Sequence, residues 1–156
     1  MVSKILAICI FLSFSGFIHA KDREITSIEI LETGVAYEGH SKIEQKVCSF
    51  FQPTKKQLIE YFEKSDWLNE GGEISHQYYS PCIVIGKVTF KNGISVKWTI
   101  QSSGYGYGVF NYNKNMIFFR KNNEWFDPFQ CTYSMGDDED DYIDCEDEVR
   151  KFMGLE

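Results

Sequence analysis

Alternation of apolar and polar residues predicts two strands in the first third of the chain. Residues 25–32 alternate around Ile28 and Ile30. Residues 43–51 alternate as well: one side carries Ile43, Val47 and Phe51, and the other carries Cys48 and Phe50. Because successive side chains of a strand point to opposite faces, both patterns indicate strands.

A hairpin is the clearest element in the middle of the chain. Two apolar-rich runs, 83–90 and 94–100, are joined by Lys91-Asn92-Gly93, and an Asn-Gly pair tolerates the positive φ angles of a tight hairpin turn. In the second run, alternation predicts two faces. The buried face carries Ile94, Val96, Trp98 and Ile100, and the solvent-exposed face carries Ser95, Lys97, Thr99 and Gln101. Further strands are expected over 109–112 and 116–119, separated by a turn at 113–115.

Helical signals occur at two places. Thr54-Lys55-Lys56-Gln57 is a capping box, which predicts a helix over 55–65 with Leu58, Ile59 and Phe62 facing inward. Near the C-terminus, helical spacing of Tyr142, Cys145, Val149, Phe152 and Met153 predicts an amphipathic helix over 138–153, which Gly154 ends. Residues 69–81 are expected to form a loop. The pattern predicts an α+β fold: a mainly antiparallel sheet, one helix after the second strand and a C-terminal helix.

The first twenty residues have the features of a secretory signal peptide. Lys4 precedes an apolar run, and Ile18-His19-Ala20 ends the segment. We expect the mature chain to begin at Lys21 and residues 21–156 to form a single domain. The apolar run is too short to span a bilayer, so no stable membrane anchor is predicted. Leu6-Ala7-Ile8-Cys9 has the outline of a lipid-attachment box, but Ile8 stands where a small residue is needed.

Export would place the four remaining cysteines in an oxidising compartment, where they are expected to form two disulfides. These residues are Cys48, Cys82, Cys131 and Cys145, and they allow three pairings. We favour Cys82 with Cys131 and Cys48 with Cys145, because the first bridge would tie the central hairpin to a later core element. The main alternative, Cys48 with Cys82 and Cys131 with Cys145, closes shorter loops.

Charge narrows the range of partners. Removing residues 1–20 takes away one lysine and no acid, so the formal net charge changes from -7 to -8. A chain this acidic is expected to repel nucleic acid and anionic membranes.

Chemical motifs point to binding rather than catalysis. The mature chain holds two histidines, His40 and His76, outside metal-ligand spacing. Glu70 and Glu73 could form a carboxylate pair, but acids are too common here for the pair to decide anything. No catalytic residue, metal site or cofactor is therefore predicted.

Three segments are candidates for a contact surface. Tyr105 and Tyr107 alternate with glycines in residues 102–108, which predicts either a glycine-relieved strand or a sticky aromatic surface. Trp125 lies in a segment typical of a packed corner or of a contact surface. The acidic run is Asp137, Asp138, Glu139, Asp140 and Asp141. It does not fit a calcium loop, because Tyr142 occupies the position that needs glycine; it suits the first turn of a helix and an acidic docking patch.

Several short motifs occur in a fixed order along residues 40–135: Ser80-Pro81-Cys82, Asn92-Gly93, Trp98-Thr99-Ile100, Phe118-Phe119 and Trp125-x-Asp127-Pro128-Phe129-x-Cys131-Thr132-Tyr133. In this pattern the chain resembles small exported proteins of Gram-negative bacteria, some of which are associated with interbacterial toxin systems as immunity proteins. The resemblance implies a periplasmic or secreted, non-catalytic protein that occludes a toxin directed at the cell envelope. An acidic, aromatic surface suits a cationic toxin as partner. The alternative is a small secreted enzyme or a small-ligand sensor, which a concave pocket with convergent polar groups would favour.

Overall fold

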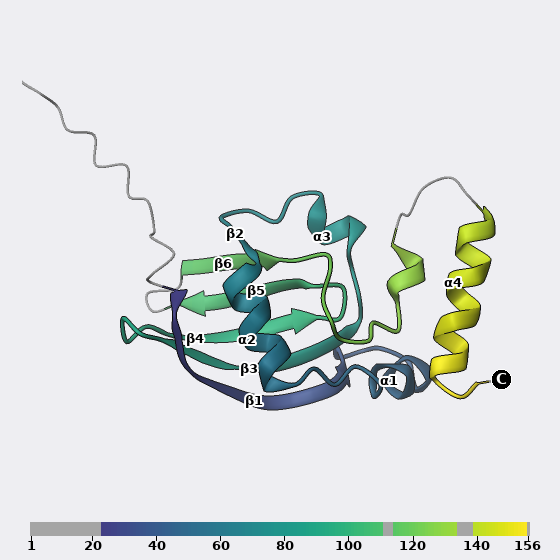
Figure 1. The fold of residues 1–156 in the computed structure, drawn as a ribbon, viewed down its shortest axis with the longest axis horizontal. Coiled ribbons are helices and arrows are strands. Elements are labelled where there is room, and N and C mark those ends of the chain that lie inside the picture. Colours follow the sequence, from purple (N-terminus) through teal and green to yellow (C-terminus); the bar gives the residue numbers. More distant parts are fainter. Residues whose placement is uncertain (1–22, 111–113, 134–138, 156) are drawn as a thin grey trace, which may run out of the picture.

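The protein has an α+β fold built on one six-stranded antiparallel sheet, as the sequence predicts (Figure 1). The computed structural model describes residues 23–110, 114–133 and 139–155; the predicted signal peptide lies outside them. The strand order is β1-β3-β4-β5-β6-β2. The strands are β1 (Ile25–Ala36), β2 (Asp66–Leu68), β3 (Cys82–Phe90), β4 (Ser95–Gln101), β5 (Tyr105–Phe110) and β6 (Lys114–Phe119). The helices are α1 (Lys42–Cys48), α2 (Lys55–Lys64), α3 (Ile74–Gln77), the 3-10 helix η2 (Gln130–Thr132) and α4 (Glu139–Phe152).

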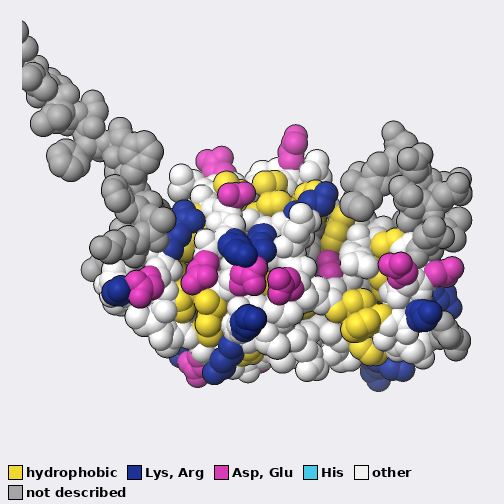
Figure 2. Space-filling model, in the orientation of Figure 1, with side chains coloured by type: hydrophobic (Ala, Val, Ile, Leu, Met, Phe, Trp, Pro, Cys, Tyr) yellow, Lys and Arg dark blue, Asp and Glu magenta, His cyan; other side chains and the backbone are white. Residues whose placement is uncertain are grey.

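The core lies between the sheet and α2, which crosses one face of the sheet (Figure 1). The predicted capping box starts this helix. The backbone N–H of Gln57 donates to Thr54 Oγ1 over 3.3 Å, and the backbone N–H of Thr54 donates to Gln57 Oε1 over 2.8 Å. The Phe62 ring meets Trp98 and Phe118 edge to face, with centroids 5.6 and 5.3 Å apart. Figure 2 shows charged side chains across the side of the molecule on which α2 covers the sheet.

Glycines on the core side of the sheet make room for these aromatic rings. A Cβ on Gly108 would stand 2.6 Å from Val96 Cγ1 and 2.9 Å from Phe118 Cε2. The glycine-relieved strand predicted over 102–108 is therefore confirmed as the start of β5, whose glycines face the core and whose tyrosines face the other way.

The strand predicted over 43–51 is wrong, because this segment contains α1. Ser41 caps the helix: the Glu44 amide nitrogen donates to Ser41 Oγ over 3.2 Å, and the Ser41 amide nitrogen donates to Glu44 Oε2 over 2.9 Å. Ile43, Val47 and Phe51 recur every four residues, which satisfies a helical period as well as strand alternation. In the helix, Ile43 is 77% exposed, whereas Cys48 and Phe51 are fully buried.

Smaller differences concern the strands and loops around β6. The expected loop over 69–81 holds α3, and the unpredicted β2 pairs with β6 over three residues. The turn expected at 113–115 is placed too far along the chain, because Asn115 already pairs with Val109 in the β5–β6 ladder. The C-terminal helix is confirmed as α4, and its helical backbone is incompatible with a calcium loop at the acidic run.

Both disulfides follow the alternative pairing, Cys48 with Cys82 and Cys131 with Cys145, so the favoured pairing is wrong. The helical turn at the end of α1 brings Cys48 to the start of β3, with a Cα–Cα distance of 4.8 Å and both cysteines fully buried. The second bridge joins η2 to α4. Disulfides persist in oxidising compartments, which is consistent with export. In the described part of the chain, no helix has the length and apolar character that crossing a bilayer requires.

Candidate functional site

The sheet face opposite α2 carries a row of apolar and tyrosine side chains. Register places Ile85 opposite Thr99, Thr99 opposite Tyr107, and Tyr107 opposite Ile117. Tyr107 is 38% exposed, and Val109, one row further along β5, is 43% exposed. With the neighbouring tyrosines, these side chains form a surface that we call the tyrosine face: Tyr37, Tyr79, Tyr105, Tyr107, Ile85, Val109 and Ile117.

Tyr79 is held in place by a histidine and a carboxylate. Its hydroxyl lies 3.0 Å from His40 Nε2, and His40 Nδ1 lies 3.2 Å from Glu44 Oε1. Hydrogen bonds from Ser41, first from its side chain and then from its backbone, lower the pKa of Glu44 and fix its carboxylate. Because a carboxylate only accepts, Nδ1–H donates to Glu44, and Nε2 forms the hydrogen bond with the Tyr79 hydroxyl. The sequence predicts only a lone loop histidine here, because the contact with Tyr79 spans distant segments.

Tyr37 follows the edge strand β1, and its side chain reaches Gln101 at the end of β4. Gln101 Nε2 donates to its hydroxyl over 3.5 Å. Burial raises the pKa of Tyr37, the bond from Gln101 opposes the rise, and Tyr107 adds to it. Thr99 and Gln101 are 8% and 5% exposed, although alternation predicts that both lie on a solvent-exposed face. The tyrosine rings and the bond from the Ser80 amide nitrogen to Gln101 Oε1 (2.8 Å) account for this difference.

The structure separates the residues that the sequence predicts as one interface. Tyr105 and Tyr107 lie on the tyrosine face, but Trp125 is 8% exposed and packs in the core against Phe51 and Tyr61, with ring centroids 5.8 and 5.4 Å away. Trp125 therefore contributes packing rather than an accessible anchor. Of the acidic run, Glu139, Asp140 and Asp141 begin α4, which lies beyond one end of the sheet (Figure 1). Asp137 and Asp138 lie outside the described residues.

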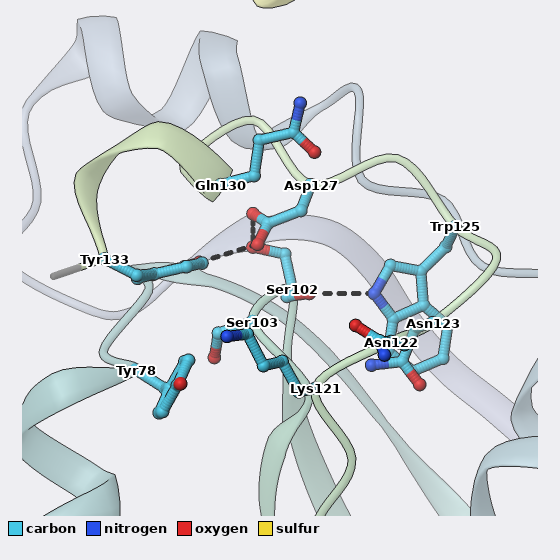
Figure 3. Close-up of a pocket in the computed structure, with 10 residues that line it drawn as sticks. All are labelled: Tyr78, Ser102, Ser103, Lys121, Asn122, Asn123, Trp125, Asp127, Gln130 and Tyr133. Carbon is cyan, nitrogen blue, oxygen red and sulfur yellow. Dashed lines mark hydrogen bonds between the residues drawn. The ribbon is translucent and has the colours of Figure 1, made fainter. Parts of the chain in front are cut away.

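A buried carboxylate organises the loop that follows β6. Asp127 accepts three hydrogen bonds. Ser102 Oγ donates to Oδ1 over 2.5 Å and the Tyr133 hydroxyl donates to Oδ2 over 2.7 Å (Figure 3); the Phe129 backbone amide nitrogen also donates to Oδ1, over 3.0 Å. The Ser80 hydroxyl extends this network to Ser102 over 2.7 Å. Burial raises the pKa of Asp127, and the three donors limit the rise. In the sequence, the Asp-Pro pair signals a turn here but not the network.

Beside this network lies a polar hollow of about 280 Å³ (Figure 3). It is bordered by the end of α3, the β4–β5 turn and the loop before η2. Its lining residues are Tyr78, Ser102, Ser103, Lys121, Asn122, Asn123, Trp125, Asp127, Gln130 and Tyr133. Sequence reasoning misses this site, because its members are scattered and belong to no motif.

Comparison with known proteins gives no match: no family model, no curated protein and no solved structure matches this chain. The likeness to exported immunity proteins therefore stays a prediction.

Proposed function

We propose that this chain is an exported, non-catalytic binding protein that holds a protein partner on the tyrosine face. In its specific form the proposal is a periplasmic immunity protein that occludes a toxin directed at the cell envelope. The observation that carries it is the row of apolar and tyrosine side chains across the sheet face opposite α2. The two disulfides and the resemblance described above support export.

Preorganisation of the tyrosines supports binding at this surface. Tyrosine offers a large, rigid contact area with a polar end, and such residues dominate the binding energy of protein interfaces. The hydroxyls of Tyr79 and Tyr37 already have partners within the chain, at His40 and Gln101. Side chains fixed before binding lose less conformational entropy when the partner arrives.

Charge supports a cationic partner. The whole sequence holds 23 acidic against 16 basic residues, and the acidic run over 137–141 concentrates five of the acids in one segment. Exposed charges act on the encounter between two proteins, whereas buried aromatic contacts act on dissociation. The acidic run is therefore proposed to steer the partner, and the tyrosine face to hold it.

A growth assay tests the proposal. Products of genes that neighbour this one are sent singly to the periplasm, and the exported chain is co-produced with each. One product should arrest growth and the wild-type chain should restore it. Tyr107→Ala should speed dissociation of that complex roughly 5- to 1,000-fold and weaken protection. Lys56→Ala, an exposed change on α2, is the control and should protect fully. Arrest by none of the products, or full protection by a folded Tyr107→Ala chain, would contradict the proposal.

A second variant separates steering from holding. Amide replacements at residues 137–141 should slow association with the same toxin and reduce its dependence on salt, and they should leave the dissociation rate nearly unchanged. Stopped-flow or biosensor kinetics at two salt concentrations give both rates. A change confined to dissociation would place the acidic run inside the interface and reject steering.

A further inference from the structure

We propose that the polar hollow beside Asp127 is a binding site for a neutral, hydroxyl-rich ring, a single saccharide unit. This site is separate from the tyrosine face. Its volume of about 280 Å³ lies just below the usual range for small-molecule sites, roughly 300 to 1,000 Å³, so the ligand must be small. Three kinds of observation support a sugar.

An unpaired buried acceptor is the first. Asn123 Oδ1 is buried and has no hydrogen-bond partner within the described residues. Its Nδ2 donates to the Arg120 carbonyl over 2.6 Å, which fixes the side chain. Gly104, with a φ of +87°, allows this close approach, since a Cβ there would stand 2.4 Å from Asn123 Nδ2. The oxygen is closed to solvent as it stands, so a ligand hydroxyl can donate to it only where neighbouring side chains give way; without such a donor it stays desolvated.

The charge of the hollow is the second. Its lining includes one cation, Lys121, and one carboxylate, Asp127, whose formal charges cancel. The exposed amides of Asn122 and Gln130 each supply a donor and an acceptor. Hydroxyl groups also donate and accept, so a polyol matches this mixture, whereas an anion would face the carboxylate and a cation would face the lysine.

Flat aromatic surfaces are the third. Figure 3 shows the rings of Tyr78 and Tyr133 on one side of the hollow, and Trp125 with Asn122 and Asn123 on the other. Tyr133 is 9% exposed, whereas Tyr78 is half-buried and has Lys121 Nζ 5.7 Å from its ring centroid. A sugar ring has polar edges and an apolar face of C–H groups, so it can pack its face on Tyr78 while its hydroxyls reach the amides and the lysine.

Nuclear magnetic resonance titration of the full mature chain tests the assignment. The probes are D-glucose and N-acetyl-D-glucosamine, with inorganic phosphate as a competing chemistry. A sugar should shift the backbone amide of Ser103 and the side-chain amides of Asn122 and Gln130, and the indole N–H of Trp98, buried in the core, should not move. The double variant Asn122→Ala/Gln130→Ala should weaken binding about 5- to 100-fold, since two hydrogen-bonding amides are lost.

Both amides are exposed, so the double variant is expected to stay folded, and the unchanged Trp98 signal checks this. Lys56→Met, on α2, is the matched control for Lys121→Met: the first should bind as wild type and the second more weakly. Shifts at the hollow with phosphate but with neither sugar would overturn the saccharide assignment. Sugar binding that the double variant leaves intact would overturn the location. Tyr107→Ala should bind sugar as wild type, because the two sites are independent.

Discussion

The carboxylate of Asp127 joins the β4–β5 turn to the loop before η2, because it accepts hydrogen bonds from both segments and from Tyr133. Replacing it with alanine would leave Ser102 and Tyr133 to find other partners and would orphan the Phe129 amide. Asp127→Ala should therefore lower the free energy of unfolding by about 1 to 3 kcal/mol or more. Urea denaturation at neutral pH measures this, and a change near zero would show that water replaces the carboxylate.

The same carboxyl group predicts a pH dependence of stability. Burial raises the pKa of Asp127 above its ordinary value of 3.8, so the folded chain binds this proton more tightly than the unfolded chain does. As the pH rises from 3.8 through the raised pKa, the folded state holds more protons, and the free energy of unfolding falls.

Asp127→Asn should remove this decline. The asparagine oxygen can still accept from Ser102 and Phe129, and its amide can donate to the Tyr133 oxygen, so the variant should stay folded. The difference in free energy of unfolding between variant and wild type, measured from pH 4 to 7, isolates Asp127 from the other carboxylates. Parallel pH curves for the two proteins would refute the raised pKa.

Gly108 should tolerate no side chain. A Cβ there would press on Val96 and on the Phe118 ring at the distances given above. Both neighbours are buried in the core and cannot move away without cost, so Gly108→Ala should destabilise the fold by about 1 to 3 kcal/mol. Ser95→Ala, an exposed change on β4, is the control. Equal melting temperatures for the two variants would show that β5 shifts freely.

At the scale of elements, local signals predict what local contacts determine. The hairpin of β3 and β4, the Thr54 capping box and α4 depend on neighbouring residues, and the sequence predicts all three. The α1 segment is ambiguous because a repeat of four residues suits both a helix and a strand; its Ser41–Glu44 capping box is the signal that could have decided it. The disulfide pairing, β2 and the polar hollow depend on contacts between distant segments, which periodicity does not report.

The disulfide between Cys131 and Cys145 fastens α4 to the rest of the fold. Helix α4 also contributes Phe152, whose ring stacks on Phe126 with the centroids 3.8 Å apart, and the buried Val149. Cys131→Ala/Cys145→Ala should therefore loosen α4 while the sheet stays folded. The two cysteines are 14 residues apart in the sequence. Losing the bridge should lower the free energy that holds α4 on the rest of the fold by about 3 kcal/mol.

Hydrogen exchange monitored by mass spectrometry distinguishes the two bridges. In Cys131→Ala/Cys145→Ala, peptides from α4 should exchange faster and those from β3 and β4 should not change. In Cys48→Ala/Cys82→Ala, exchange should rise across the sheet, because both sulfurs are fully buried against the core. Uniform changes in both variants would mean that α4 and the sheet open together.

At the scale of the whole molecule, the two sides of the sheet differ in character. The side covered by α2 ends in an outer layer of charged residues, in which Glu60 pairs with Lys64 and Arg120 (Figure 2). The other side presents tyrosines and aliphatic side chains in register, with the exposed Lys87 and Lys97 two residues away from Ile85 on β3 and from Thr99 on β4. Solvated charge is expected on any outer surface, whereas an exposed aromatic row is typical of a contact surface.

Site-specific photo-crosslinking in periplasm tests this account most directly. A photoreactive phenylalanine analogue is placed at Lys97, beside Val109 on the tyrosine face, and in a second variant at Lys56 on α2. We predict that the first variant captures one envelope-active protein and that Tyr107→Ala reduces the capture, while the second variant captures nothing specific. Capture from Lys56 alone, or from neither position, would contradict the account.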